Sequence, residues 1–153
     1  RGAFVGLTRA TTRGTFVRAI LEGLCYEMHS IVQAMQELSG QSVESIYAIG
    51  GAAKSAFWMQ MKADVTGIPV RSKDVPEAAA LGAAMLAGLG AGVYASPEEA
   101  VARVRFAERE YVPDEARHAQ YMELYETLNR ALYPALREFN AAVTRAQGTN
   151  EGK

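Results

Sequence analysis

Two long amphipathic helices dominate the pattern of hydrophobic and polar positions. Between residues 17 and 38, large apolar side chains recur at three- and four-residue steps, the spacing of one face of an α-helix. These positions are Val17, Ile20, Leu21, Leu24, Met28, Ile31, Met35 and Leu38. Thr11 or Thr12 is expected to cap this helix, and Gly40 is expected to end it.

A second stripe with the same spacing predicts a helix that opens at Pro113-Asp114 and continues to about residue 146. Its apolar positions are Tyr121, Leu124, Tyr125, Leu128, Leu132, Leu136, Phe139 and Val143. Pro134 lies inside this stripe, and a kink is expected there because proline cannot donate the helical hydrogen bond. Residues 147–153 are expected to form a disordered tail.

Short apolar runs between the helices predict brief strands. We expect strands at residues 3–7, 46–49 and 68–70, and an extended stretch at residues 105–112. Strands that alternate with helices predict an α/β fold. Three brief strands leave sheet edges open, so further strands are expected from elsewhere in a longer protein or from a second copy.

Capping signals predict three shorter helices. The first covers residues 55–66. The second comprises the small side chains of residues 78–87, with Asp74 as its expected cap. A helix this poor in bulky side chains is expected to pack closely against a sheet or another helix. The third starts at Ser96 and reaches about residue 104.

Composition narrows the class of protein. The chain has 153 residues, is 49% hydrophobic and carries a formal net charge of −1, so we expect one domain with a real core. This charge argues against nucleic acid and anionic membranes as partners. Cys25, the single cysteine, fits a reducing cytoplasm and is expected to be a buried thiol. No signal peptide or membrane span is recognised, and the initial Arg1 suggests a piece of a longer protein.

The candidate binding feature is a glycine junction between the second predicted strand and the helix after it. Gly50 and Gly51 follow the strand, and Ser55 opens the helix. Glycines let the backbone approach a ligand closely, and a helix N-terminus attracts phosphate. The spacing does not match a Walker loop, because Ala53 rather than glycine precedes Lys54, and it does not match the dinucleotide fingerprint. From the residues alone, a nucleotide contact and an ordinary tight turn both stay open.

The residues predict neither a catalytic group nor a metal site. His29 and His118 are far apart in sequence, and no further histidine or cysteine lies near either. His29 is expected on the helix surface or with its hydrogen bonds satisfied. Asp64 is expected to be a structural partner of the glycine turn, and Glu77 to be a helix cap rather than a base.

Four stretches occur in a characteristic order and spacing. They are Arg1-Gly2-Ala3-Phe4-Val5-Gly6-Leu7-Thr8, Arg18-Ala19-Ile20-Leu21-Glu22-Gly23, Gly50-Gly51-Ala52-Ala53-Lys54-Ser55 with Trp58, Gln60, Ala63 and Asp64, and Glu77-Ala78-Ala79-Ala80-Leu81-Gly82-Ala83-Ala84. Together, over residues 1 to about 95, they resemble the C-terminal domain of the FGGY carbohydrate kinases. The tail, with Tyr121, Tyr125 and Leu132-Tyr133-Pro134-Ala135-Leu136, is similar to the xylulokinase branch, whereas Gly6-Leu7-Thr8-Arg9 also resembles glycerol kinase.

The resemblance implies a partial actin/hexokinase-like (ribonuclease H-like) ATPase domain in residues 1–112. Extra C-terminal helices would follow in residues 113–146. The helix at residues 78–87 would be the family's interdomain connecting helix. The family's catalytic aspartate and sugar pocket lie in an N-terminal domain outside this chain, so no catalytic and no metal-binding residue is carried over.

The resemblance also assigns the glycine junction to ATP. Gly50, Gly51 and Ala52 would lie against the ribose and phosphates, and Ser55 would lie near the adenine. The implied activity is transfer of the ATP γ-phosphate to a sugar hydroxyl, with Mg²⁺ as a further cofactor and D-xylulose as the first substrate.

Two alternatives stay open. One is a glycerol or other polyol kinase of the same family, and the other is a non-catalytic oligomerisation module in which the glycines form only a turn. A homodimer, or pairing with the N-terminal domain, is expected. The chain alone is predicted to be catalytically inert and to bind ATP weakly.

Overall fold

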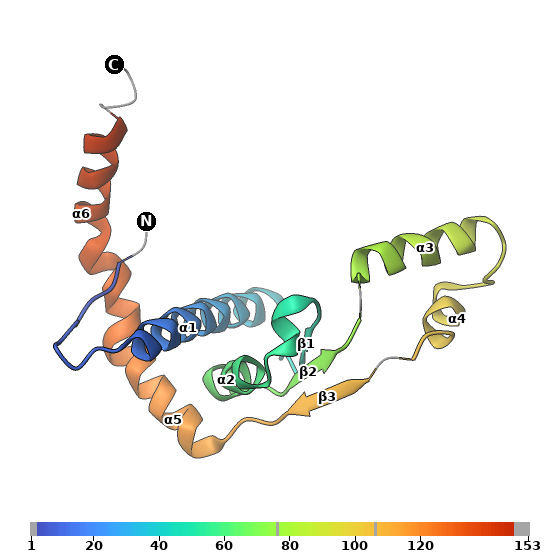
Figure 1. Ribbon diagram of the computed structural model, residues 1–153, viewed down its shortest axis with the longest axis horizontal. Coiled ribbons are helices and arrows are strands. Elements are labelled where there is room, and N and C mark those ends of the chain that lie inside the picture. Colours follow the sequence, from blue (N-terminus) through green and yellow to red (C-terminus); the bar gives the residue numbers. More distant parts are fainter. Residues whose placement is uncertain (1–2, 76, 106, 149–153) are drawn as a thin grey trace.

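The computed structural model describes residues 3–75, 77–105 and 107–148 (Figure 1). Its elements in chain order are α1 (Arg13–Ser39), β1 (Ile46–Ala48), η1 (Gly51–Lys54), α2 (Ala56–Thr66), β2 (Val70–Lys73), α3 (Ala78–Gly90), α4 (Pro97–Ala102), β3 (Glu108–Tyr111), α5 (Glu115–Leu124), η2 (Tyr125–Asn129) and α6 (Arg130–Gly148). A small sheet lies in the middle of the molecule. Helices α3 and α4 extend to one side of it, and α6 extends to the other (Figure 1).

The sheet has three strands in the order β1-β2-β3. Strands β1 and β2 are parallel, with Ile46 opposite Val70, and β3 pairs antiparallel with β2, with Arg109 opposite Ser72. Strand β2 starts at Val70, directly after Pro69, so the third predicted strand lies two residues later than expected. Proline is tolerated there because it precedes the first residue of the strand.

Helix α2 is the centre of the hydrophobic core. One face of α2 packs on the sheet in a cluster of Ala53, Met59, Ala63, Val70 and Tyr111. The opposite face joins α1, α5 and η2 in a second cluster of Cys25, Tyr26, Met61, Val65, Tyr121 and Tyr125. Helix α2 therefore contributes to both clusters, and it starts directly after the glycine junction.

Helix α1 forms as predicted, but most of its apolar stripe does not face this core, and Leu21 is the stripe residue that packs against it. Thr12 caps the helix, accepting a hydrogen bond from the Thr15 N–H at 3.2 Å, and Gly40 ends it in the left-handed conformation. The buried residues of α1 are Cys25 and Tyr26, which join the cluster with α2, α5 and η2, and His29, which packs against Tyr125 of η2. The stripe residues that are at least half exposed are Val17, Ile20, Leu24, Ile31, Met35 and Leu38.

The predicted strand at residues 3–7 is wrong. These residues form no strand, and Phe4, Val5 and Leu7 are at least half exposed. A strand needs a neighbour to satisfy its backbone, and no described strand pairs with this segment. Phe4 instead packs edge-on against Phe16, with ring centroids 5.0 Å apart.

Helix α3 starts at Ala78 as predicted, but its predicted cap is wrong. Glu77 precedes the helix with φ +46° and no side-chain cap. Asp74 is not the cap: it lies three residues before Glu77, and its N–H donates to the Ala107 carbonyl at 3.1 Å, which extends the pairing of β2 with β3. Pro76, in the predicted capping segment, lies outside the described residues.

The small side chains of α3 make one close contact. A Cβ on Gly88 would lie 2.5 Å from the ring of Tyr94, so an alanine there would require this ring to shift. None of the described α3 residues is buried, and α4 is the main neighbour of the helix. The expected close packing along the whole helix is therefore not formed within the described part of this chain.

The C-terminal helices follow the predicted signals with one difference. Ser96 caps α4 and Asp114 caps α5, each accepting a hydrogen bond from the N–H three residues later. The chain widens into one π-helical turn, η2, before α6, and Pro134 lies inside α6. The main irregularity thus precedes the proline. Helix α6 includes Gln147 and Gly148, and the rest of the predicted tail lies outside the described residues.

None of the helices in the described ranges combines the length and hydropathy of a membrane span.

Candidate functional site

The glycine junction forms a tight path from β1 into α2. Gly50 adopts φ +85°, a conformation that side chains with a Cβ rarely take, and its carbonyl accepts the Ala53 N–H at 3.1 Å. One 3₁₀ turn, η1, then leads to Ser55, whose Oγ accepts the Trp58 N–H at 3.3 Å and caps α2. The four predicted binding residues, Gly50, Gly51, Ala52 and Ser55, therefore lie on one exposed turn.

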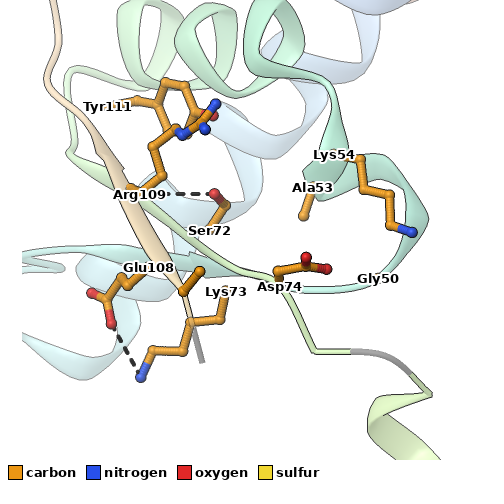
Figure 2. A pocket seen from close by; sticks show the side chains of 10 residues that line it. Gly50, Ala53, Lys54, Ser72, Lys73, Asp74, Glu108, Arg109 and Tyr111 are labelled. Atoms are coloured by element: carbon orange, nitrogen blue, oxygen red, sulfur yellow. Dashed lines mark hydrogen bonds and ion pairs between the residues drawn. The ribbon is translucent and has the colours of Figure 1, made fainter. Parts of the chain in front are cut away.

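A pocket of about 310 Å³ opens beside this turn (Figure 2). It lies where the parallel strands β1 and β2 end and β3 begins. The carboxyl ends of parallel strands are the usual ligand-binding edge of an α/β sheet. The lining residues are Gly50, Ala53, Lys54, Ser72, Lys73, Asp74, Ala107, Glu108, Arg109 and Tyr111.

The pocket has a buried floor and a charged rim. Ala53, Ser72 and Tyr111 are buried, and the Ser72 hydroxyl donates to the Arg109 carbonyl at 3.4 Å. Among the charged residues, Lys73 Nζ lies 3.4 Å from Glu108 Oε2. A neutral floor below a rim of both charges suits a polar ligand with an anionic group.

One of the four predicted binding residues lines the pocket, and several other lining residues were not predicted. Gly50 lines it, whereas Gly51, Ala52 and Ser55 do not. The missed residues are Lys54, Ser72, Lys73, Asp74 and Arg109. Asp74 could have been predicted as a pocket residue, because it directly follows a strand. The β3 residues could not, because they reach the pocket through the antiparallel pairing of β3 with β2, which no local pattern predicts.

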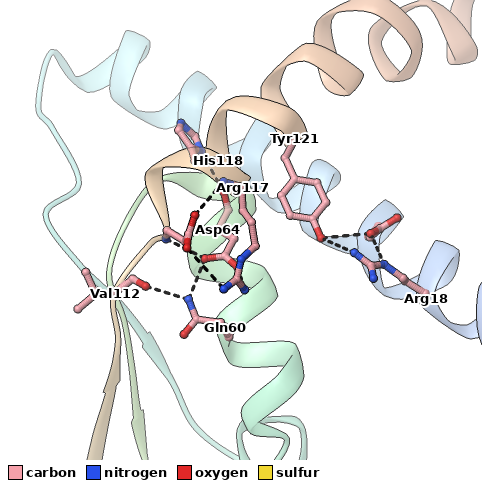
Figure 3. A network of polar contacts seen from close by, with 9 residues as sticks. Arg18, Gln60, Asp64, Val112, Arg117, His118 and Tyr121 are labelled. Carbon is pink, nitrogen blue, oxygen red and sulfur yellow. Dashed lines mark hydrogen bonds and ion pairs between the residues drawn. The ribbon is translucent and has the colours of Figure 1, made fainter.

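Asp64 is not a partner of the glycine turn. It is buried near the other end of α2, where Oδ1 accepts hydrogen bonds from Gln60 Nε2 at 2.8 Å and the Asp114 N–H at 3.0 Å (Figure 3). Arg117 Nη1 lies 3.1 Å from Asp64 Oδ2. Gln60 also donates to the Val112 carbonyl at 2.8 Å. These contacts fasten the segment that follows β3 to α2, and so hold the β3 wall of the pocket against the glycine junction.

The histidines do not form a metal site. His29 is 6% exposed, and its Nε2 has no hydrogen-bond partner among the described residues, so the expectation of a surface or satisfied histidine is wrong. His118 Nδ1 lies 2.9 Å from the Asp64 carbonyl. Within the described residues no group of three or more His, Cys, Asp or Glu side chains could hold a metal ion.

Cys25 is buried as predicted. Burial raises the pKa of its thiol to about 11, and the nearby Trp58 and Lys62 oppose this shift only in part. The thiol is therefore protonated at neutral pH and is a poor nucleophile.

Comparison with known proteins places these features in a family. Residues 1–91 match the C-terminal domain of the FGGY family of carbohydrate kinases. The chain belongs to this family. Its α/β architecture matches the C-terminal domains of FGGY sugar kinases, which have the actin/hexokinase-like fold, so the predicted fold class is confirmed.

Glycerol kinases are among the individual relatives of this chain. A glycerol kinase of Saccharolobus islandicus is 40% identical over 86% of this chain, and glycerol kinase 2 of Thermotoga maritima is 39% identical over the same share. The chain spans 27% of the length of these curated relatives.

The similar solved structures include xylulose kinases and a glycerol kinase. A xylulose kinase of Rhodospirillum rubrum superimposes with a TM-score of 0.73 at 33% identity, over 90% of this chain and 28% of that protein. A glycerol kinase of Plasmodium falciparum with ADP superimposes with a TM-score of 0.67 at 27% identity, over 83% of this chain and 26% of that protein.

Proposed function

We propose that the complete protein is an ATP-dependent carbohydrate kinase and that this chain forms one wall of its nucleotide cleft. The observation that carries the proposal is the pocket beside Gly50, at the carboxyl ends of two parallel strands, in a chain of the FGGY family. This is the edge at which α/β sheets bind their ligands.

The glycine junction is proposed to hold the nucleotide. Gly50, Gly51 and Ala52 have no bulky side chains, so the backbone of this turn can approach the ribose and phosphates closely. Ser55 would lie near the adenine. In phosphoryl transfer Mg²⁺ neutralises the charge of the phosphates, and we assign it to the ATP and to the part of the protein that carries the catalytic aspartate.

The rest of the domain assignment is part of the same proposal. Residues 1–112 would form the nucleotide-binding part, and residues 113–146 would form the helical extension. The chain would pair with the N-terminal domain or with a second copy. A cytoplasmic location agrees with the reduced, buried thiol of Cys25.

D-xylulose is the first proposed substrate. The similarity of the C-terminal tail to the xylulokinase branch and the superposition on xylulose kinases support it. Glycerol is the second candidate, because the curated relatives with about 40% identity are glycerol kinases.

The test is a substrate panel on the complete protein. ADP release is measured with Mg²⁺-ATP and D-xylulose, glycerol or other polyols, and D-xylulose should give the highest kcat/KM. A higher value for glycerol would replace the first substrate with the second. Absence of turnover with every sugar and polyol would refute the kinase assignment.

Two glycine variants of the complete protein test whether the glycine junction holds the nucleotide. Gly50→Ala should raise the KM for ATP, because an alanine at φ +85° strains the turn that holds the nucleotide. Gly40→Ala, at a positive-φ glycine that ends α1 outside the pocket, should leave this KM unchanged.

The 153-residue chain alone should show no sugar-dependent turnover and no micromolar ATP affinity by calorimetry.

A further inference from the structure

The cations around the sheet differ in whether they already have a partner. Arg71 donates to Glu110 at 2.9 Å and to the Tyr47 hydroxyl at 3.3 Å, and Lys73 pairs with Glu108. The side chains of Lys54 and Arg109 have no ion pair and no hydrogen bond among the described residues. Both of these unpaired cations line the pocket beside Gly50.

Lys54 and Arg109 come from separate elements and stand on opposite sides of the pocket, with Asp74 between and below them (Figure 2). Lys54 is the last residue of η1, and Arg109 belongs to β3. Both side chains are exposed, so their charges remain hydrated.

The unpaired charge in the pocket is predominantly positive. Its two carboxylates are Glu108, which is held by Lys73, and Asp74, which makes no ion pair within the described part of the chain. Two free cations against one free carboxylate favour a ligand with at least one anionic group. Asp74 can accept a hydrogen bond from a hydroxyl of the same ligand.

We propose that Lys54 and Arg109 bind the phosphate groups of the nucleotide from two sides of this pocket. Arginine can bind phosphate through two parallel N–H donors, and lysine acts as a mobile point charge. This inference rests on the proposed function. It also extends the nucleotide site to β3, which lies beyond the residues 1–91 that match the family domain.

The test compares ligands with and without phosphate on the complete protein. Calorimetry at low ionic strength gives the affinities of ATP, adenosine and inorganic tripolyphosphate for the wild type, Lys54→Gln and Arg109→Gln. Each substitution should weaken ATP and tripolyphosphate by about fivefold to tenfold, and leave adenosine within about twofold. Arg103→Gln is the matched control, because Arg103 is an exposed cation paired with Glu99 on α4, away from the pocket.

The outcomes separate this inference from the kinase proposal. Unchanged ATP affinity in both pocket variants, or an equal loss for adenosine, would overturn the phosphate site while ATP binding itself stands. If the wild type binds tripolyphosphate through these two residues but binds no nucleotide, the anion site stands and the kinase proposal fails. Binding of none of the three ligands would refute both.

Discussion

At the scale of single residues, His29 is a buried titratable group whose Nε2 has no hydrogen-bond partner among the described residues. Its ring lies edge-on to Tyr125, with centroids 4.9 Å apart. Burial lowers the pKa of His29 below its ordinary value of 6.5, nearby His118 lowers it further, and Glu126 opposes these effects. At neutral pH the folded protein therefore holds His29 in its neutral form.

The buried neutral form of His29 predicts a pH dependence of stability. Below pH 6.5 the unfolded chain binds a proton that the folded chain resists, so stability falls as the pH drops, by at most about 1.4 kcal/mol per pH unit for one proton. The loss ends once the pH is below the lowered pKa of folded His29. Urea unfolding between pH 7.5 and pH 5 measures this loss of stability.

The matched variants separate His29 from other titrating groups. His29→Phe keeps a ring against Tyr125 and should flatten the stability profile below pH 6.5, whereas His118→Gln should retain most of the slope. Identical profiles for the wild type and His29→Phe would show that His29 contributes nothing to the pH dependence.

At the scale of elements, the packing of α2 against α5 depends on the glycine that ends α2. Gly67 has φ +71°, and an added Cβ would lie 2.7 Å from His118 Cε1. Gly40 ends α1 with a similar φ of +66°, but an added Cβ there meets no atom within 4 Å. The two positions share the backbone strain and differ in the clash with His118.

Gly67→Ala should therefore destabilise the protein more than Gly40→Ala. The strain alone is expected to cost about 1 kcal/mol in each variant. The clash with His118 should add about 1–3 kcal/mol at Gly67, because the ring cannot shift without weakening its contact with the Asp64 carbonyl. Thermal unfolding of both variants measures the difference. Equal losses of stability would mean that His118 moves freely.

Helix ends were predictable from the sequence because capping is local. Thr12, Ser55, Ser96 and Asp114 each accept a hydrogen bond from an N–H three residues away, so a short window of sequence contains both partners. Asp74 is also an aspartate, but it lies three residues before Glu77, the residue that precedes α3, and its N–H pairs with Ala107, which is distant in sequence. The capping prediction therefore failed where a non-local sheet contact took its place.

The candidate site was predictable only in part for the same reason. Gly50 could be found from the strand, glycine and helix order. Arg109 could not be found, because its place in the pocket follows from the register of β3 against β2. Local sequence patterns therefore predict the glycine turn. The opposite wall of the pocket follows only from the pairing of β3 with β2.

At the scale of the whole molecule, α1 presents two apolar faces. Cys25, Tyr26 and His29 face the core, while the exposed stripe runs along a different side of the helix from Val17 to Leu38. An apolar surface this long on one helix is typical of an interaction site. It supports the proposal that the chain packs against another part of the kinase or a second copy.

This surface predicts that the 153-residue chain alone self-associates. Sedimentation velocity over a concentration series should show dimers or larger species, because each association removes the α1 stripe from water. The double variant Ile31→Lys, Met35→Lys should shift the chain toward monomer. Leu86→Lys, Val101→Lys adds the same charge at exposed apolar positions of α3 and α4, and should leave association unchanged. A wild-type chain that stays monomeric at every concentration, or an equal effect of the two variants, would show that the α1 stripe does not drive association.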